Sequence, residues 1–98
     1  MVIVAILTVR RAELDAFRKF ETHAARVMAE HGGRLERNVV VDDGASETLT
    51  EIHFLRFPDE AAFAAYRANP KLTAEQALRE RSVLQTTVFV GDDGPLYE

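Results

Sequence analysis

The sequence predicts a single α+β domain in which helices cover one face of a four-stranded antiparallel sheet. The first reason is length, because 98 residues suffice for one hydrophobic core but not for two. The second is that four short segments are rich in apolar and β-branched residues, as strands are. The third is that the segments between the first and second strands, and between the third and fourth, have helical periodicity.

The first strand and the first helix have the clearest patterns. Residues Val2–Val9 are almost wholly apolar, which is typical of a strand that is covered on both faces. Residues 11–31 predict a helix with charged residues on one side. Gly32 and Gly33 are expected to end this helix, because glycine adopts the left-handed C-cap conformation without a steric penalty. The apolar stripe of the helix consists of Phe17, Phe20, Ala24 and Met28.

The next two strands are predicted as a hairpin. Residues 34–41 alternate charged and apolar side chains in their first half, as edge strands do to resist aggregation. Residues 42–46 have the composition of a turn and include a glycine. Residues 47–57 predict the third strand, with His53 and Glu51 on one of its two faces.

The second helical segment is shorter and interrupted. Residues 59–68 predict a helix with Asp59 as its N-cap, and the pair Asn69-Pro70 is expected to end it. Thr73 and Gln76 have the spacing of a capping box, which predicts a further short helix to about Ser82. Residues 83–90 predict the last strand.

The resulting order β-α-β-β-α-β is that of a ferredoxin-like sheet. Right-handed crossovers predict that the first and last strands are central and that the second lies at an edge. The helices cover only one face, yet the third strand carries apolar residues on both. Because a bare apolar face is unfavourable in a monomer, we expect a homodimer in which two sheets pack face to face. A monomer covered by the C-terminal tail is the alternative. The apolar residues of the third strand are Ile52, Phe54, Leu55 and Phe57.

Composition, charge and missing motifs argue against several classes of function. The chain has no cysteine, which excludes disulfides, thiolate metal sites and cysteine nucleophiles. A net charge of −4 disfavours nucleic-acid binding, and no apolar segment is long enough to span a membrane. No secretion signal, phosphate loop or dinucleotide fingerprint is present, so we expect a cytoplasmic protein without a cofactor or metal.

Four short segments are together typical of one family: Gly32-Gly33-Arg34, Phe57-Pro58, Glu60-Ala61-Ala62-Phe63-x-x-Tyr66 and Asn69-Pro70. With them the chain resembles a bacterial family of small uncharacterised proteins in the dimeric α+β barrel superfamily. The resemblance covers nearly the whole chain and implies this fold. Other branches are cofactorless antibiotic-biosynthesis monooxygenases, haem-degrading monooxygenases and muconolactone-isomerase-like enzymes, so the resemblance implies little about the reaction.

The resemblance also places the ligand between the sheet and the helices of each subunit. The haem-degrading branch relies on an asparagine in the first strand, a tryptophan at the end of the third and a histidine after it. The matching positions here are Ala5 and Phe57, and no histidine follows His53. The sequence therefore argues against haem degradation.

His53 and Glu21 are the candidate catalytic residues. His53 lies in the middle of a strand, where a buried imidazole can exchange a proton near neutral pH. Glu21 falls within the apolar stripe of the first helix, and burial there would raise its pKa. The alternative is that His53 is a structural, hydrogen-bonded histidine and that Glu21 bonds Arg18 or a strand residue.

Four further residues are candidates for ligand binding. Glu51 shares a strand face with His53, although a cross-strand pair with Arg37 is an equally good interpretation. Arg37 is a candidate anchor for an anionic group, with an ordinary ion pair as the alternative. Phe57 and Tyr66 are expected at the pocket wall and mouth, with Tyr66 otherwise a core aromatic. The remaining expected walls are Leu7, Phe17, Met28, Leu55 and Phe63.

The leading hypothesis is a small-molecule pocket with cofactor-independent proton transfer, as in an isomerase or a monooxygenase. The sequence does not decide whether the protein is an enzyme. The rival hypothesis is a non-catalytic binding or structural dimer whose aromatic rings fill the space between sheet and helices. A weaker idea is that the acidic tail, residues 92–98, docks to a protein partner.

Overall fold

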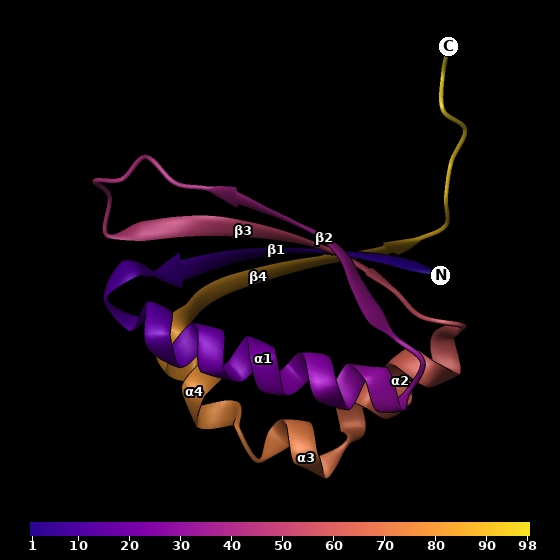
Figure 1. Ribbon diagram of the computed structural model, residues 1–98, viewed down its shortest axis with the longest axis horizontal. Helices are drawn as coiled ribbons and strands as arrows, with labels where there is room; N and C mark the ends of the chain where they lie inside the picture. Colours follow the sequence, from indigo (N-terminus) through magenta and orange to yellow (C-terminus); the bar gives the residue numbers. More distant parts are fainter.

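The computed structural model describes all 98 residues and has the predicted ferredoxin-like α+β fold. Four strands form one sheet, and every helix lies on the same side of it (Figure 1). A 3-10 turn at Arg11–Glu13 leads from the first strand into the first helix. The elements in chain order are β1 (Val2–Arg10), α1 (Leu14–Glu30), β2 (Arg34–Val41), β3 (Thr48–Arg56), α2 (Glu60–Ala68), α3 (Pro70–Thr73), α4 (Gln76–Ser82) and β4 (Val83–Gly91).

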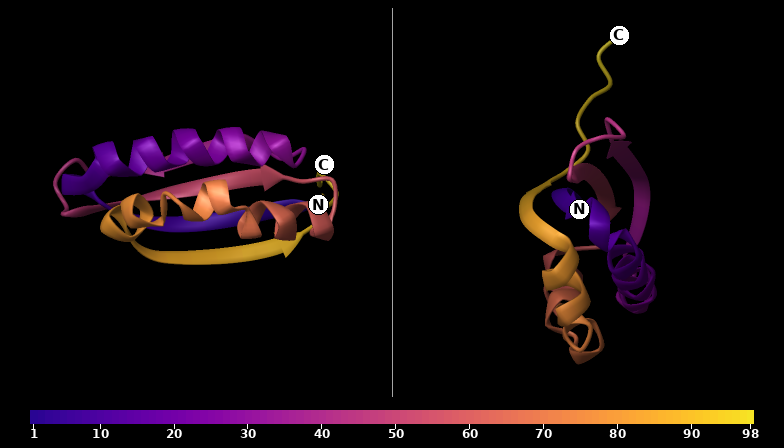
Figure 2. Two further views of the ribbon diagram at one scale, coloured as in Figure 1. Left: turned by 90° about the horizontal axis from the view of Figure 1, so that it is seen from below. Right: turned by 90° about the vertical axis from the view of Figure 1, so that its left-hand side faces the viewer.

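The strand order is β2-β3-β1-β4, and all neighbours are antiparallel. The second strand lies at an edge as predicted, but the expectation that the last strand is central was wrong. The crossover rule fixes the hand of a connection and not the position of a strand. The short turn after β2 pairs it with β3, and β3 occupies the central place beside β1, so β4 takes the remaining edge. Figure 2 shows α1 on the β3 side of the sheet and α2–α4 on the β4 side.

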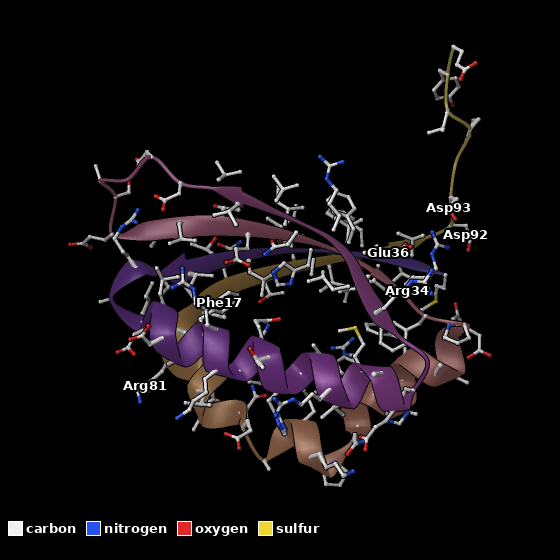
Figure 3. The ribbon with its side chains drawn as sticks, in the orientation of Figure 1. Phe17, Arg34, Glu36, Arg81, Asp92 and Asp93 are labelled. Carbon is white, nitrogen blue, oxygen red and sulfur yellow. The ribbon has the colours of Figure 1, made fainter.

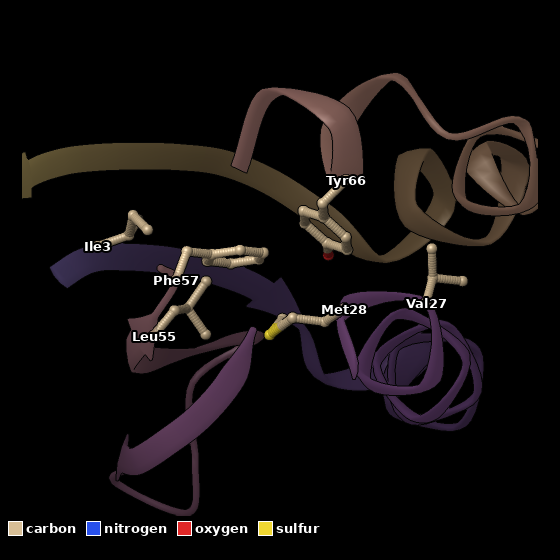
Figure 4. Close-up of a cluster of buried hydrophobic side chains, with 6 residues drawn as sticks. All are labelled: Ile3, Val27, Met28, Leu55, Phe57 and Tyr66. Atoms are coloured by element: carbon tan, nitrogen blue, oxygen red, sulfur yellow. The ribbon is translucent and has the colours of Figure 1, made fainter. Parts of the chain in front are cut away.

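The helix-facing side of the sheet forms the core. Alternate residues of β1 and β3 are buried there, while the residues between them face outward and are half-buried. Figure 4 shows one of the two core clusters, in which Phe57 packs among residues of β1, β3, α1 and α2. The Phe57 ring lies 5.2 Å from that of Phe63 and 5.3 Å from that of Tyr66, measured between centroids. This cluster consists of Ile3, Val27, Met28, Leu55, Phe57 and Tyr66.

The predicted end of the first helix is confirmed. Gly32 has a φ of +72°, which is the left-handed conformation that favours glycine. Gly33 is buried, and a Cβ atom at this position would overlap the Phe57 ring and the Met28 side chain. The glycine pair therefore ends α1 and also lets the chain pass directly over the core.

The caps of the second helical segment agree only in part with the prediction. Asp59 caps α2 by accepting a hydrogen bond from the backbone N–H of Ala62. The capping box at Thr73 and Gln76 is not formed, because Thr73 belongs to α3 and its hydroxyl bonds the Pro70 carbonyl. Asn69 caps α3 instead, which is the usual role of asparagine before proline at the first helical position.

The outer face of the sheet carries an apolar stripe with no helix over it. Val4 pairs with Phe54 on one side and with Phe89 on the other, and Phe89 is 59% exposed. The C-terminal segment leaves β4 on this side of the sheet, away from the helices (Figure 1). Its start is held by an ion pair between Asp93 and Arg56, 2.9 Å long, close to the Arg34 and Glu36 side chains (Figure 3).

No helix has both the length and the apolar composition that crossing a membrane requires.

Candidate functional site

His53 lies in the middle of β3 with its ring turned toward the helices, and it is almost fully buried. Its Nε2 atom is 2.9 Å from Oε1 of Glu51, two residues earlier on the same strand. The Asn38 side chain, from the neighbouring strand β2, donates a hydrogen bond of 2.9 Å to the same carboxylate oxygen. An ionised carboxylate only accepts hydrogen bonds, so Nε2 is the donor to Glu51, and in the neutral form of the ring the lone pair is on Nδ1.

Glu21 approaches the imidazole from the other side. It extends from α1, and its Oε2 atom is 3.8 Å from Nδ1 of His53. Burial raises the pKa of Glu21 above the ordinary glutamate value, and the charge on Glu51 acts in the same direction, whereas His53 and Arg79 lower it. A carboxyl group with a raised pKa can give or take a proton nearer to neutral pH. The two predicted catalytic residues therefore lie together, with Glu51 behind them.

A cavity of about 330 Å³ opens in front of this group, between the sheet and the helices. Its apolar wall includes Ala5 of β1, which lies between His53 and Val88 in the register of the sheet. Ala5 is the smallest side chain in that row, so it leaves space beside the imidazole. The polar lining consists of Glu21, His53, Tyr66, Arg67, Thr73, Gln76, Arg79 and Thr86.

A second hollow of about 80 Å³ lies on the β2 side of the imidazole, where Asn38 and Glu51 face it. His53 and Glu21 border both hollows, whereas Glu51 borders only the smaller one. His53 and Glu21 are therefore the titratable groups of this cluster that a molecule in the larger cavity can reach. Glu51 acts on such a molecule only through His53.

The other predicted site residues are divided between the cavity and the rest of the fold. Tyr66 lines the cavity, and burial raises the pKa of its phenol to about 12. Phe57 is fully buried in the core and does not line the cavity, and the same holds for Phe17. The other expected walls do line it, namely Leu7, Met28, Leu55 and Phe63.

Arg37 is not part of this group. It is exposed and pairs with Phe54, whose side chain belongs to the outer face of the sheet. The register of β2 shifts between Leu35 and Arg37, and such a bulge moves the following residues to the opposite face. Glu51 consequently pairs with Asn38 and His53 rather than with Arg37.

Sequence reasoning missed the polar residues on the far side of the cavity. Gln76 and Arg79 lie one turn apart on α4, and the Arg79 guanidinium donates a hydrogen bond of 2.6 Å to the Thr86 hydroxyl on β4. A signal was present, because residues three apart on a helix share a face. This signal is weak, because a short helix rich in charged residues does not show which of its faces is turned toward the sheet.

The geometry is suited to proton transfer. Nδ1 of His53 can accept a proton from a molecule in the cavity, and the ionised Glu51 stabilises the resulting imidazolium. Glu21 Oε2 is 3.8 Å from the same nitrogen, which is too far for a direct hydrogen bond, so a proton can pass between them only through a water or the bound molecule. No group of three or more histidine, aspartate or glutamate side chains is arranged to hold a metal ion.

Comparison with known proteins was informative at the level of structure only. No family model matches the sequence, and no curated protein matches it. The fold is similar to SnoaB, a cofactor-independent oxygenase from Streptomyces nogalater, with a TM-score of 0.64 and 14% identity over 95% of this chain and 94% of that chain. An antibiotic biosynthesis monooxygenase has a TM-score of 0.66 at 18% identity, covering 97% of this chain and 100% of its own.

A third neighbour is a protein of unknown function from Rhodopseudomonas palustris, with a TM-score of 0.72 at 14% identity over 95% of this chain and 84% of that chain. These likenesses confirm the predicted resemblance for the fold. The chain has the ferredoxin-like α+β fold that antibiotic biosynthesis monooxygenases and uncharacterised bacterial proteins share.

Proposed function

We propose that the protein binds a small organic molecule in the 330 Å³ cavity and that His53 removes a proton from it. The observation that carries this proposal is the buried imidazole, whose Nε2 is held by Glu51 and whose Nδ1 faces Glu21 and the cavity. A base that is oriented by a carboxylate and faces a ligand-sized space is the usual arrangement for general base catalysis. That SnoaB is a cofactor-independent oxygenase supports a reaction that needs no cofactor.

The proposed reaction begins when an acidic C–H or O–H of the substrate gives its proton to Nδ1. The electron pair stays on the substrate as an enolate or phenolate, and the positive charge on the ring is balanced by Glu51. Return of the proton at another carbon, from His53 or Glu21, completes an isomerisation. In an oxygenation, the anion reacts with O₂, and conversion of a CH₂ group to a carbonyl releases one water, with the substrate supplying all the electrons.

Proton removal can be measured without knowing the later steps. A panel of phenolic and enolisable aromatic compounds is incubated with the protein in D₂O, and loss of C–H signals is followed by proton NMR. We expect His53→Gln to lower the exchange rate by about 10²–10⁴-fold, which is the usual contribution of a general base. His23→Gln is the matched control, because His23 bonds the Lys71 carbonyl outside the cavity.

Two results would decide against this reaction. Exchange that is equally fast in wild type and His53→Gln would show that His53 is not the base. Compounds that bind in the cavity without any exchange would assign the protein to the rival class, a non-catalytic binding protein. Oxygen uptake measured on the same compounds separates the oxygenase from the isomerase.

We also propose that the protein acts as a homodimer in which the outer faces of two sheets pack together. The support is the apolar stripe of Val4, Phe54 and Phe89, which no element of the chain covers. Phe89→Arg would place two charges against each other in such an interface, so sedimentation velocity should show a monomer. Val90→Arg is the control, because Val90 is similarly exposed but pairs with Ile3 on the other face. A wild-type monomer would refute the dimer.

A further inference from the structure

The charged groups of the cavity are segregated. Glu21 and His53 occupy the wall formed by α1 and β3, with Glu51 behind them. Arg67 of α2 and Arg79 of α4 belong to the opposite wall, on the β4 side (Figure 2). A molecule in the cavity therefore has a proton acceptor at one end and cationic groups at the other.

Arg79 is a cation at the cavity without a carboxylate partner inside the protein. Some arginines of the chain pair with carboxylates, for example Arg81 with Glu13 at 2.9 Å and Arg56 with Glu36 at 2.8 Å. Arg67, on the same wall of the cavity, contacts the Phe63 ring instead. The polar contact of Arg79 is the hydrogen bond of one Nη atom to the neutral Thr86 hydroxyl. A guanidinium group has five N–H donors, so this bond holds the group in place and leaves donors free for a ligand.

The surroundings of Arg79 make it a better anchor than a surface arginine. It is half-buried, lies one helical turn from Gln76, and both residues line the cavity. It is also near enough to Glu21 and Tyr66 to lower the pKa of each. Glu21 acts on Arg79 only at longer range, because its ion-pair partner is His53 and not the Arg79 guanidinium.

We infer that the cavity takes a small organic anion, with its carboxylate on Arg79 and Gln76 and its reacting atom at Nδ1 of His53. This inference rests on the proposed function and names the substrate class of the same site. Thr86 and Glu51 lie in one row of the sheet with Leu7 between them, so their backbones are two strand spacings apart, about 10 Å. That span suits an aromatic or unsaturated acid of one or two rings.

Arg79 would act as a specificity residue as well as an anchor. A guanidinium group binds a carboxylate through two parallel hydrogen bonds, which fixes the direction of the ligand as well as its position. The acidic C–H or O–H at the far end of the ligand is then directed to the base. Arg67, whose guanidinium lies 5.5 Å from the centre of the Phe63 ring, adds positive charge on the same side.

The test compares benzoate with benzamide, which has nearly the same shape but no charge. Binding of each is measured at pH 7 by calorimetry or by NMR titration of the full-length protein. We expect wild type to bind benzoate at least about tenfold more tightly than benzamide, since a charge-assisted hydrogen bond is about twice as strong as a neutral one. Arg79→Met should abolish this preference and weaken benzoate alone, and Arg79→Lys should keep part of it.

Arg81→Met is the matched control on the same helix. Figure 3 shows the Arg81 side chain directed away from the cavity, so its loss should leave the preference unchanged. Ala5→Leu, which fills the cavity, should weaken both probes and so locate them there. Thermal unfolding of each variant verifies that it is folded.

The outcomes separate failure of the anion site from failure of the proposed pocket. A benzoate preference that survives Arg79→Met, or an affinity for benzoate that is unaffected by Ala5→Leu, overturns the inference because the anion then binds elsewhere. Equal binding of both probes in the cavity also overturns it but leaves the proposed pocket and the role of His53 standing. Binding of neither probe at millimolar concentration refutes the anion site together with ligand binding by molecules of this size.

Discussion

Replacement of Ala5 by leucine measures how much stability the protein forgoes by keeping the space in front of His53 open. The substitution adds three carbon atoms to a side chain that lines the 330 Å³ cavity, and a fully buried CH₂ contributes about 0.8 kcal/mol. The gain in the free energy of unfolding is thus at most about 2.4 kcal/mol. The rotamer entropy that a buried leucine loses reduces this gain by about 0.5–1 kcal/mol. We expect the free energy of unfolding to rise by about 1–2 kcal/mol, while binding in the cavity is lost.

The assay is urea unfolding followed by circular dichroism, at one protein concentration because a dimer makes stability concentration-dependent. In thermal unfolding the same change corresponds to a rise in Tm of roughly 5–15 °C for a domain of this size. Ala24→Leu is the matched control, because Ala24 is buried but does not line the cavity. Overpacking at this position should lower the free energy of unfolding by about 1–3 kcal/mol. If Ala5→Leu is destabilised as much as Ala24→Leu, other side chains fill this space in solution and the cavity is absent.

Three other predictions concern single groups. Glu21→Gln should not change stability well below pH 4.5, the ordinary pKa of glutamate. It should become stabilising as the pH rises through the raised pKa of the folded state, because only wild type then buries a charge. A stability difference that does not vary with pH contradicts this. Gly33→Ala should lower the free energy of unfolding in urea by about 1–3 kcal/mol, because the new Cβ atom overlaps the core. Gly91→Ala is the control, since Gly91 lies in open space and its replacement should have little effect. Equal losses in the two variants would show that overlap with the core is not the cause. Tyr97→Phe leaves Tyr66 as the sole tyrosine. Alkaline titration of the folded variant, followed by absorbance, should show half-ionisation of the Tyr66 phenol at a pH of about 12. Half-ionisation near pH 10.0 would show that this phenol is solvated.

The fold could be predicted because its signals are local and repetitive. The periodicity of residues 11–31 and the near-continuous apolar run of β1 located the first two elements to within a few residues. The strand order could not be derived in the same way, because pairing joins residues far apart in the sequence. The capping box failed for a related reason: Asn69-Pro70 begins a helix turn of its own, and this placed Thr73 inside α3 rather than before α4.

For the candidate site, the sequence indicated that His53 and Glu21 face the core but did not decide which residues they contact. His53 and Glu21 were recognisable because each is a polar residue at a position that the pattern assigns to the core. The contact between Glu51 and His53 depends on rotamers, and the exclusion of Arg37 depends on one bulged residue in β2. Arg79 was not recognised because long charged side chains are usually solvated, and only its bond to Thr86 shows that this one turns inward.

The hydrogen bonds of the cluster do not by themselves distinguish a functional site from a structural one. Glu51, His53 and Asn38 satisfy one another, and a structural role would need nothing more. A structural role gives no reason, however, for an adjoining cavity that one larger side chain at Ala5 would fill with a gain in stability. It also gives no reason for a cation without a carboxylate partner on the opposite wall.

Functional sites are where proteins keep such unfavourable features, because larger apolar side chains would otherwise replace them. The base, the space and the unpaired arginine are each common in proteins, and each has an ordinary explanation when it occurs alone. Here they lie on two walls of one cavity, in an order that suits a molecule with an acidic hydrogen at one end and a negative charge at the other. The proposed ligand binding with proton transfer accounts for all three together.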